Sequence, residues 1–289
     1  MISEKTDVAI IGSGNIGCDL LVKIQKSKYL ECILFSGQRE ESPGIAFAKT
    51  LKVPTSIKSI EGILESKAAI VFDATTASAH KRHAQSLKDR FVIDMTPSKV
   101  GLFCIPTLNL QEALGEKNIN LISCGAQAAI PLIKGIMEVH PEIKYIELVG
   151  TIASKSAGIG TRDNIDEYVQ TTQEAIEKFT KVKKAKVILV VNPAEPPLIM
   201  HNTIYAQIKG ANIRKLTRKL KGIEAQIQVY VPGYHLKGKP TQLDDRLIVM
   251  NEVTGSGDYL PKYAGNLDVI TSGAIKIAEE YAKRISADN

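Results

Sequence analysis

The sequence predicts an α/β protein of two domains, the first built on a parallel sheet and the second a mixed α+β fold. Three observations support this. A short apolar run, a glycine-rich turn and a helical pattern open the chain, and further apolar runs that end in polar turn residues follow. After about residue 125 the pattern changes to alternating strands and longer helices. We expect residues 1–125 with 265–289 to form the first domain, and residues 126–264 the second.

The first motif joins a strand, a GxGxxG turn and a helix in the order that dinucleotide binding requires. The strand is predicted over residues 7–11 and the helix over 18–26. The glycines permit a tight turn, a close approach to a pyrophosphate, and helix–strand packing, while free N–H groups at the helix start bind phosphate. This order predicts a Rossmann domain, although a tight turn without a ligand has the same pattern. The candidate cofactor-binding residues here are Gly12, Ser13, Gly14, Asn15, Ile16 and Gly17.

The end of the second predicted strand bears on the choice of cofactor. Residues 31–35 form an apolar run, and Ser36 and Arg39 follow where an NAD enzyme usually places an acidic residue for the ribose. A hydroxyl and a guanidinium suit a 2′-phosphate, so the sequence favours NADP over NAD. Glu40 and Glu41 lie nearby, and Arg39 as an ordinary exposed loop residue is the alternative.

Three later apolar runs are predicted as further parallel strands: residues 69–73, 91–94 and 121–124. Ligands of open α/β sheets gather at the carboxyl ends of the strands, so we expect Thr75, in the turn after the first of these, to contact the cofactor. Asp73 and Asp94 are expected to cap their turns. Cys124 would stand at a strand end near a helix start, a position that lowers a thiol pKa, although most free cysteines are buried and inert.

The second half of the chain alternates strands and helices. Helices are predicted over residues 164–180, 213–223 and 264–285, and strands over residues 143–152, 186–191, 225–231 and 247–253. The last helix closes the fold.

Composition excludes several classes of protein. The net charge of +6 collects largely in residues 181–186 and 214–221, and the second run has the spacing of a solvated helix face. Neither a DNA-reading motif nor a tryptophan accompanies it, so a nucleic-acid partner is not expected. No apolar run reaches membrane length, the first residues lack a signal-peptide core, and a cytoplasmic location is the default.

The cysteines and histidines do not form a metal site in the sequence. Cys18, Cys32 and Cys104 are expected to be structural, because the four cysteines match neither a zinc site nor a disulfide framework. His80 and His83 are three residues apart, as metal ligands can be, but no further ligand accompanies them and we expect them on a helix surface. No metal is predicted.

Several motifs together resemble the acylating acetaldehyde dehydrogenases, which make acetyl-CoA at the end of meta-cleavage pathways for aromatic compounds. The resemblance covers nearly the whole chain. It is carried by the glycine loop and by FDATTASAH (72–80), DMTP (94–97), SCGAQAAIP (123–131), SKSAGIGTR (154–162), NPAEPPLIM (192–200) and YLPKYAGNLD (259–268).

The resemblance implies a bilobal fold similar to the glyceraldehyde-phosphate and aspartate-semialdehyde dehydrogenases, with a Rossmann lobe completed by the C-terminal helix. It implies that Cys124 is the nucleophile and that Asn266 lies near the nicotinamide carboxamide, a position in which asparagine also suits a helix cap. The implied reaction oxidises acetaldehyde or another short aldehyde through a thiohemiacetal and a thioester on Cys124, with CoA as co-substrate. A homodimer and a 4-hydroxy-2-oxoacid aldolase partner are implied as well.

The chain departs from the family in three places. The family places an Asp, held to assist as a general base, where this chain has Asn202, and an amide cannot accept a proton in acid–base work. His201 serves as the base, another group or water does so in a slower enzyme, or the acylating activity is lost. The family often has Asp at the position of Arg39, and residues 238–256 form a shorter segment than its counterpart. These departures leave the aldolase partner and the size of the aldehyde open.

Two other functions remain as alternatives. A semialdehyde-type acyl-phosphate reductase would use phosphate in place of CoA, but no clear Arg/His phosphate site is found near Cys124. A catalytically impaired NAD(P)-binding homologue that acts as a partner protein is the second alternative, and Asn202 motivates it.

Overall fold

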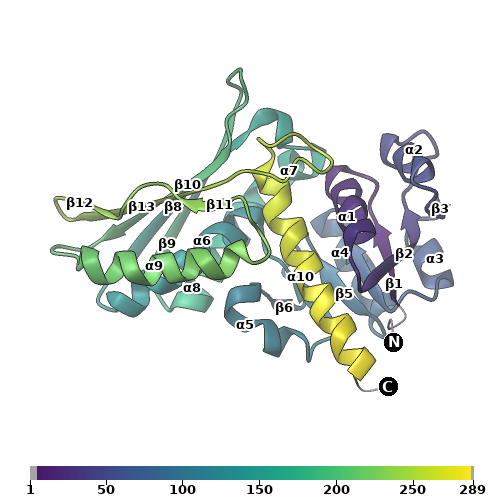
Figure 1. Cartoon of the computed structure of the whole chain (residues 1–289), viewed down its shortest axis with the longest axis horizontal. Coiled ribbons are helices and arrows are strands. Elements are labelled where there is room, and N and C mark those ends of the chain that lie inside the picture. Colours follow the sequence, from purple (N-terminus) through teal and green to yellow (C-terminus); the bar gives the residue numbers. More distant parts are fainter. Residues whose placement is uncertain (1–4, 288–289) are drawn as a thin grey trace. The chain divides into compact units, whose positions relative to one another are not determined.

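The computed structural model describes residues 5–287, with the backbone alone for residues 159 and 160. The chain forms two compact units: unit 1 extends to Leu121 and resumes at Ile270, and unit 2 comprises residues 122–269 (Figure 1). The start of the chain that we considered for a signal peptide, residues 1–4, lies outside the described residues.

Unit 1 is built on a seven-stranded parallel sheet with the order β3-β2-β1-β4-β5-β7-β6. The strand order reverses beside β1, as in dinucleotide-binding folds, and this confirms the predicted α/β class. The strands are β1 (Thr6–Ile11), β2 (Leu30–Ser36), β3 (Thr55–Ser56), β4 (Ile70–Asp73), β5 (Phe91–Asp94), β6 (Leu102–Phe103) and β7 (Asn118–Asn120). The helices are α1 (Asn15–Lys26), α2 (Pro43–Thr50), α3 (Ile60–Glu65), α4 (Ala77–His83) and α5 (Pro106–Ala113), with a 3₁₀ turn at Ala84–Leu87. Helix α10 (Gly265–Ala287) belongs to unit 1 from Ile270 onward, and its first five residues belong to unit 2.

The C-terminal helix α10 completes unit 1 through contacts that the sequence could not specify. The Tyr281 ring stacks on Phe91 of β5, with the ring centroids 3.9 Å apart. The Thr271 hydroxyl donates to the Asp19 carboxylate in α1 at 2.5 Å. Helix α10 therefore joins the sheet and α1 of the same unit, although more than 150 residues separate it from β5 along the chain.

Unit 2 is built on a six-stranded mixed sheet with the order β11-β13-β10-β8-β9, and β12 pairs with β13. Its strands are β8 (Tyr145–Ala153), β9 (Lys184–Asn192), β10 (Met200–Gln207), β11 (Tyr234–Leu236), β12 (Thr241–Leu243) and β13 (Arg246–Val253). Its helices are α6 (Cys124–Val139), α7 (Ile159–Asp163), α8 (Ile165–Thr180) and α9 (Ile213–Gln228), with a 3₁₀ turn at Ser154–Ser156.

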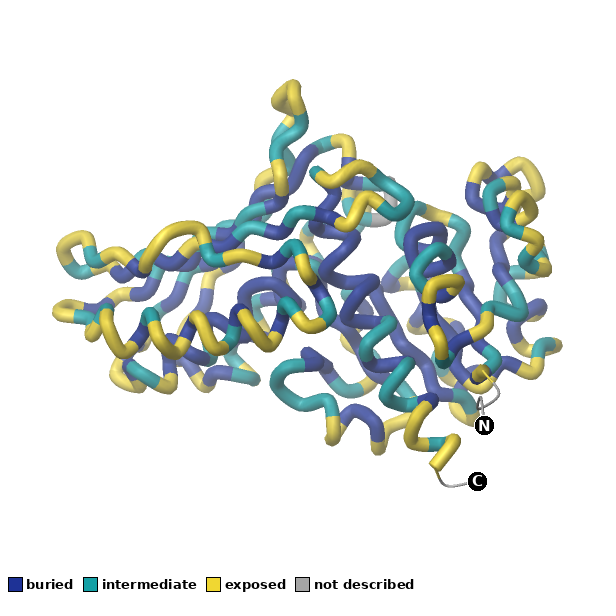
Figure 2. Tube along the Cα trace, viewed as in Figure 1, coloured by how far each residue is buried: buried dark blue, intermediate teal, exposed yellow. Residues whose placement is uncertain are grey.

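The two faces of the second sheet differ in burial. Side chains alternate along β10 and β13, so that one face packs against α6, which Figure 2 shows almost wholly buried. The other face carries partly exposed apolar side chains, and Val190 and Met250 on it are 37% and 39% exposed. This second face is described below as the open face.

Two predicted strands are wrong. Residues 121–124 do not form a strand, because Ile122 adopts φ +67° and Ser123 then caps α6, which begins at Cys124. Residues 225–231 are not a strand either, since α9 continues to Gln228 and buries Leu216, Leu220 and Ile227 along one side. The short run at residues 225–231 fits the periodicity of a strand and that of a helix equally well, and packing decided for the helix.

No helix among residues 5–287 is long and apolar enough to cross a membrane.

Candidate active site

Cys124 occupies the first position of helix α6. Ser123 is the N-cap, and its hydroxyl accepts the N–H of Ala126 at 3.0 Å. The same hydroxyl contacts the Thr172 hydroxyl of α8 at 2.7 Å, which ties the two helices together beside the cysteine. The thiol therefore lies where helix N–H groups have no intrahelical partner.

The pKa of Cys124 is raised rather than lowered, which corrects the expectation from its place near a helix start. Burial raises the pKa to about 11, and hydrogen bonds from the Gly125 N–H and the Tyr168 hydroxyl offset only part of this effect. Loss of hydration of the thiolate on burial raises the pKa more than these donors lower it. The prediction considered the helix start but could not foresee the burial.

Tyr168 is the residue of this site that sequence reasoning missed. It belongs to α8, is 7% exposed, and its hydroxyl is hydrogen-bonded to Cys124. Two glycines leave room for it: a Cβ atom at Gly125 would lie 2.1 Å from Tyr168 Oη, and one at Gly150 would lie 3.5 Å away. The same Cβ at Gly150 would lie 3.1 Å from Asn202 Oδ1, so the Tyr168 hydroxyl and the Asn202 amide converge on one glycine.

The structure separates Asn202 from His201. Asn202 is fully buried on β10 and its amide donates to Asn251 Oδ1 at 3.4 Å, while its own Oδ1 has no hydrogen-bond partner among the described residues. The pairing of β10 with β8 and β13 is continuous through both positions, so His201 lies on the open face. The hypothesis that His201 takes over the position of Asn202 is therefore wrong.

In unit 1, the glycine loop has the geometry that a pyrophosphate site requires. Gly12 has φ +114°, and a Cβ there would lie 2.5 Å from the carbonyl oxygen of Ala74. Gly14 is the N-cap of α1, and a Cβ there would meet nothing within 4 Å, so the backbone is open to a ligand. A Cβ at Gly17 would lie 2.0 Å from the Gly12 carbonyl oxygen. The residues present thus fit a dinucleotide at the start of α1.

The other predicted cofactor residues of unit 1 differ in availability. Ser36 is fully buried and donates its hydroxyl to the Ser59 carbonyl at 2.7 Å, so it has no proton left to donate to a phosphate. Arg39 is exposed. Ser13 shares a hydrogen bond with Ser42 at 2.8 Å, and the Thr75 hydroxyl donates to Asp73. Of these two residues, Arg39 can therefore bind a 2′-phosphate and Ser36 cannot donate to one.

His80 and His83 are buried, which corrects the expectation of a helix surface. His80 Nδ1 lies 2.9 Å from Asp73 Oδ2, and its Nε2 lies 3.1 Å from the Asn118 amide and 3.5 Å from Asp94 Oδ2. Both aspartates also accept N–H groups of their turns, as predicted. No group of three or more His, Cys, Asp or Glu side chains that could hold a metal ion occurs among the described residues.

The charges in this cluster are coupled. Burial opposes ionisation of Asp73, but the hydrogen bond from His80 and the nearby His83 ring, whose Nδ1 lies 3.7 Å from Asp73 Oδ2, lower its pKa to about 2. Burial lowers the pKa of His80, yet its hydrogen bond to Asp73 and the charge of Asp94 raise it above the ordinary value. Burial raises the pKa of Asp94 to about 6. The cluster supports the turn at residue 75, on which the glycine loop packs.

Asn266 is the second residue of α10. Its amide donates to the Ser156 carbonyl at 3.5 Å, and its Oδ1 is buried without a hydrogen-bond partner among the described residues. An unpaired buried acceptor is costly, so this atom fits a ligand that brings an N–H donor, as a carboxamide does.

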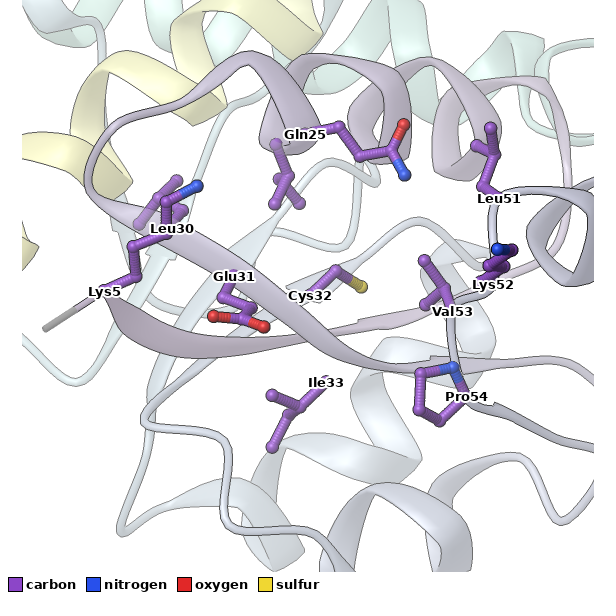
Figure 3. Close-up of a pocket in the computed structure, with 11 residues that line it drawn as sticks. Lys5, Gln25, Leu30, Glu31, Cys32, Ile33, Leu51, Lys52, Val53 and Pro54 are labelled. Atoms are coloured by element: carbon purple, nitrogen blue, oxygen red, sulfur yellow. The ribbon is translucent and has the colours of Figure 1, made fainter.

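A cavity of about 690 Å³ in unit 1 is not part of these sites (Figure 3). Lys5, Leu30, Glu31 and Cys32 line it at the amino end of β2, whereas the glycine loop follows the carboxyl end of β1. Burial raises the pKa of the Cys32 thiol to about 12, which keeps it unreactive.

Comparison with known proteins agrees with this geometry. A family model described as the dimerisation part of prokaryotic acetaldehyde dehydrogenase matches residues 124–261. An acetaldehyde dehydrogenase from Pectobacterium atrosepticum is 46% identical, with 96% of each chain covered. One from Geobacillus stearothermophilus is 47% identical with 97% of each chain covered, and one from Desulfitobacterium hafniense is 48% identical over 98% of this chain and 97% of the relative.

The chain belongs to the acetaldehyde dehydrogenase family. Membership makes it an oxidoreductase of the aldehyde dehydrogenase class, as predicted. In fold it is similar to the crystal structure of aspartate semialdehyde dehydrogenase II from Vibrio cholerae, with a TM-score of 0.64 at 14% identity over 97% of this chain and 99% of that one.

Proposed function

We propose that the chain is a CoA-acylating aldehyde dehydrogenase that uses Cys124 as its nucleophile. The observation that carries the proposal is the position of this thiol, at the first residue of α6 with hydrogen bonds from the Gly125 N–H and the Tyr168 hydroxyl. A cysteine in such a position has donors directed at the sulfur and at the oxygen that an attacked carbonyl would bear.

The chemistry balances without a carboxylate at position 202. Cys124 adds to the aldehyde carbon, and the thiol proton ends on the carbonyl oxygen to give a thiohemiacetal. A bound nicotinamide would supply the hydride acceptor for the thiohemiacetal carbon, the hydroxyl proton would leave to water, and a thioester would remain on Cys124. The thioester on Cys124 is then attacked by the CoA thiol, whose proton returns to Cys124 as the acyl group leaves. Cysteine suits these steps because it is both a strong nucleophile and a good leaving group.

Asn202 orients rather than accepts a proton in this proposal. Its Oδ1 is buried and unpaired in the described part of the chain, and it lies beside Gly150. It can hold a water or a substrate hydroxyl by accepting a hydrogen bond. We infer that water takes the proton during hydride transfer, since His201 lies on the open face.

The cofactor is proposed to be held by the glycine loop of unit 1. In unit 1 the residues 12–17 and the N–H groups at the start of α1 would bind the pyrophosphate, and Arg39 would bind a 2′-phosphate, which favours NADP over NAD. Asn266, whose buried Oδ1 has no hydrogen-bond partner among the described residues, is proposed separately as an acceptor for a carboxamide N–H. Ser36 is left out of this set because its proton is engaged with Ser59.

A homodimer is proposed through the open face of the second sheet. The matched family model describes a dimerisation region, and it spans the strands that form this face. Val149, Ile188 and Met250 lie in one row across neighbouring strands of the face. Such a row of partly exposed apolar side chains is typical of a surface that a second chain covers. An aldolase partner remains a further proposal.

The test is reduced-cofactor absorbance with short aldehydes, with and without CoA, using NAD and NADP in parallel. We expect turnover that depends on CoA and is abolished in Cys124→Ala. Turnover with phosphate in place of CoA would favour an acyl-phosphate reductase. Cofactor binding without turnover for any aldehyde would indicate a catalytically impaired homologue that acts as a partner protein.

A further inference from the structure

The Tyr168 hydroxyl lies against the first turn of α6, beside Gly125. The Tyr168 carbonyl accepts the Thr172 hydroxyl at 2.6 Å, and Thr172 in turn contacts Ser123, the N-cap of α6. The absence of a side chain at Gly125 provides the space that the phenol oxygen occupies, because a Cβ there would lie 2.1 Å from it. The phenol therefore reaches the thiol along a path that only glycine leaves open.

Among the described residues, no ionised side chain contributes to the pKa of Cys124. The contributions are burial, the backbone N–H of Gly125, the Tyr168 hydroxyl and its own backbone. From β10 and β13 the nearby groups are the neutral amides of Asn202 and Asn251. Helix α9 packs on α6 at Gly135, and its buried Glu224 is bonded to Lys221 and to the N–H of residue 236.

The thiolate of Cys124 thus depends on neutral donors alone. Two are backbone groups, those of Gly125 and of Cys124 itself, and a side-chain substitution does not remove them. The other is the Tyr168 hydroxyl, a side-chain donor whose loss can be tested. Hydrogen bonds to a charged acceptor are stronger than those between neutral groups, so this donor matters most when the sulfur is negative.

We propose that Tyr168 is a catalytic residue that donates its hydroxyl hydrogen to Cys124 Sγ and stabilises the thiolate, both when the sulfur attacks the aldehyde and when it leaves the thioester. This role rests on the proposed function of Cys124. No proton passes from the phenol in either step: the hydrogen bond shortens as negative charge develops on sulfur and relaxes when the C–S bond has formed.

The phenol is suited to donate and unsuited to act as a base. Burial and the neighbouring thiol raise the pKa of Tyr168 well above its ordinary value of 10.0, so the hydroxyl keeps its hydrogen near neutral pH. Tyr168 therefore does not replace the carboxylate that Asn202 lacks. It supplies a different function, which is stabilisation of the charged sulfur.

The test is alkylation of the full chain by iodoacetamide at pH 8.5, with the rate at Cys124 followed by mass spectrometry of its peptide. Loss of a donor to a charged group should lower the Cys124 rate in Tyr168→Phe by about tenfold or more. The matched control is Tyr234→Phe. Tyr234 is also fully buried in unit 2 and its hydroxyl donates to the Ala128 carbonyl of α6 at 2.7 Å, so this variant should lose thermal stability but keep the wild-type alkylation rate.

A second variant carries 3-fluorotyrosine at position 168, which keeps the size of the ring and has a more acidic phenol. It should alkylate faster than the wild type, whereas Tyr168→Phe alkylates more slowly. Opposite shifts of this kind do not follow from a structural role. Equal rates for the wild type and both variants would overturn the proposal, and so would an equal loss of rate in Tyr234→Phe.

Turnover with CoA, measured on the same preparations, separates this inference from the proposed function. If the wild type turns over aldehyde while Tyr168→Phe keeps its alkylation rate, the role of Tyr168 is refuted and the function stands. If the wild type shows no turnover while Tyr168→Phe is alkylated tenfold more slowly, the function is refuted, and the role of Tyr168 is reduced to tuning of thiol reactivity.

Discussion

Replacement of His80 by glutamine tests how the buried charges of unit 1 support the turn on which the glycine loop packs. The variant leaves the fully buried Asp73 carboxylate without its cationic partner at 2.9 Å. The pKa of Asp73 falls from 3.8 to about 2 in the folded protein, and at about 1.36 kcal/mol per pKa unit this lowering corresponds to roughly 2.5 kcal/mol. Removal of one partner from a buried ion pair typically costs about 3–5 kcal/mol. We therefore expect His80→Gln to lower the free energy of unfolding by about 2–4 kcal/mol.

The cost of His80→Gln depends on pH, and the pKa shifts of His80 and Asp73 give its direction. The pKa of His80 is raised in the folded state, so its contribution is complete below its ordinary value of 6.5 and is lost as the pH rises through the folded pKa. Asp73 has a lowered pKa, so its contribution is present above 3.8 and is lost as the pH falls through about 2. The cost of His80→Gln should therefore be greatest between about pH 4 and 6.5, and smaller at pH 9.

The assay is urea unfolding followed by far-UV circular dichroism at pH 5.5 and pH 9. His235→Gln is the matched control, because His235 is 53% exposed and lies 4.0 Å from Glu224, so its loss should cost less than about 0.5 kcal/mol. A double variant with Asp73→Asn should recover part of the cost, since it removes the unpaired charge. The reasoning is refuted if His80→Gln costs no more than the control at pH 5.5, or if its cost is larger at pH 9.

Three further predictions concern the candidate site. Asn202→Asp places a carboxyl group at a fully buried position, so burial should raise its pKa, and urea unfolding should show stability lost relative to the wild type as the pH rises from 5 to 8. Gly17→Ala should lower the free energy of unfolding by about 1–3 kcal/mol in thermal unfolding, because its Cβ would lie 2.0 Å from the Gly12 carbonyl oxygen. The same variant should weaken cofactor binding in calorimetry by at least about tenfold. An unchanged Kd would count against the glycine loop as the phosphate site. Arg39→Ala should weaken NADP by about tenfold while NAD changes little, and equal losses for both cofactors would contradict a 2′-phosphate contact.

Local patterns in the sequence predicted the architecture of unit 1 well. Strand β1, the glycine loop and the start of α1 follow one another within about twenty residues, and each has a local signature: an apolar run, glycines at fixed spacing, and helical periodicity. The long helices α8 and α10 were also predicted, because their apolar residues recur over several turns. Where the local signal was short, as at residues 121–124 and 225–231, it predicted strands that packing and a left-handed residue at Ile122 exclude.

The sequence by itself determined which thiol and which glycines are candidates, because these depend on residue type and spacing along a short segment. Only the tertiary structure decided their surroundings. Tyr168 reaches Cys124 from 44 positions further along the chain, and Asn118 reaches His80 from 38 positions away. The pKa of a thiol or an imidazole is set by burial and by such distant partners, and neither is encoded in the spacing of neighbouring residues. For this reason the sequence could propose Cys124 as a nucleophile but predicted the wrong direction for its pKa.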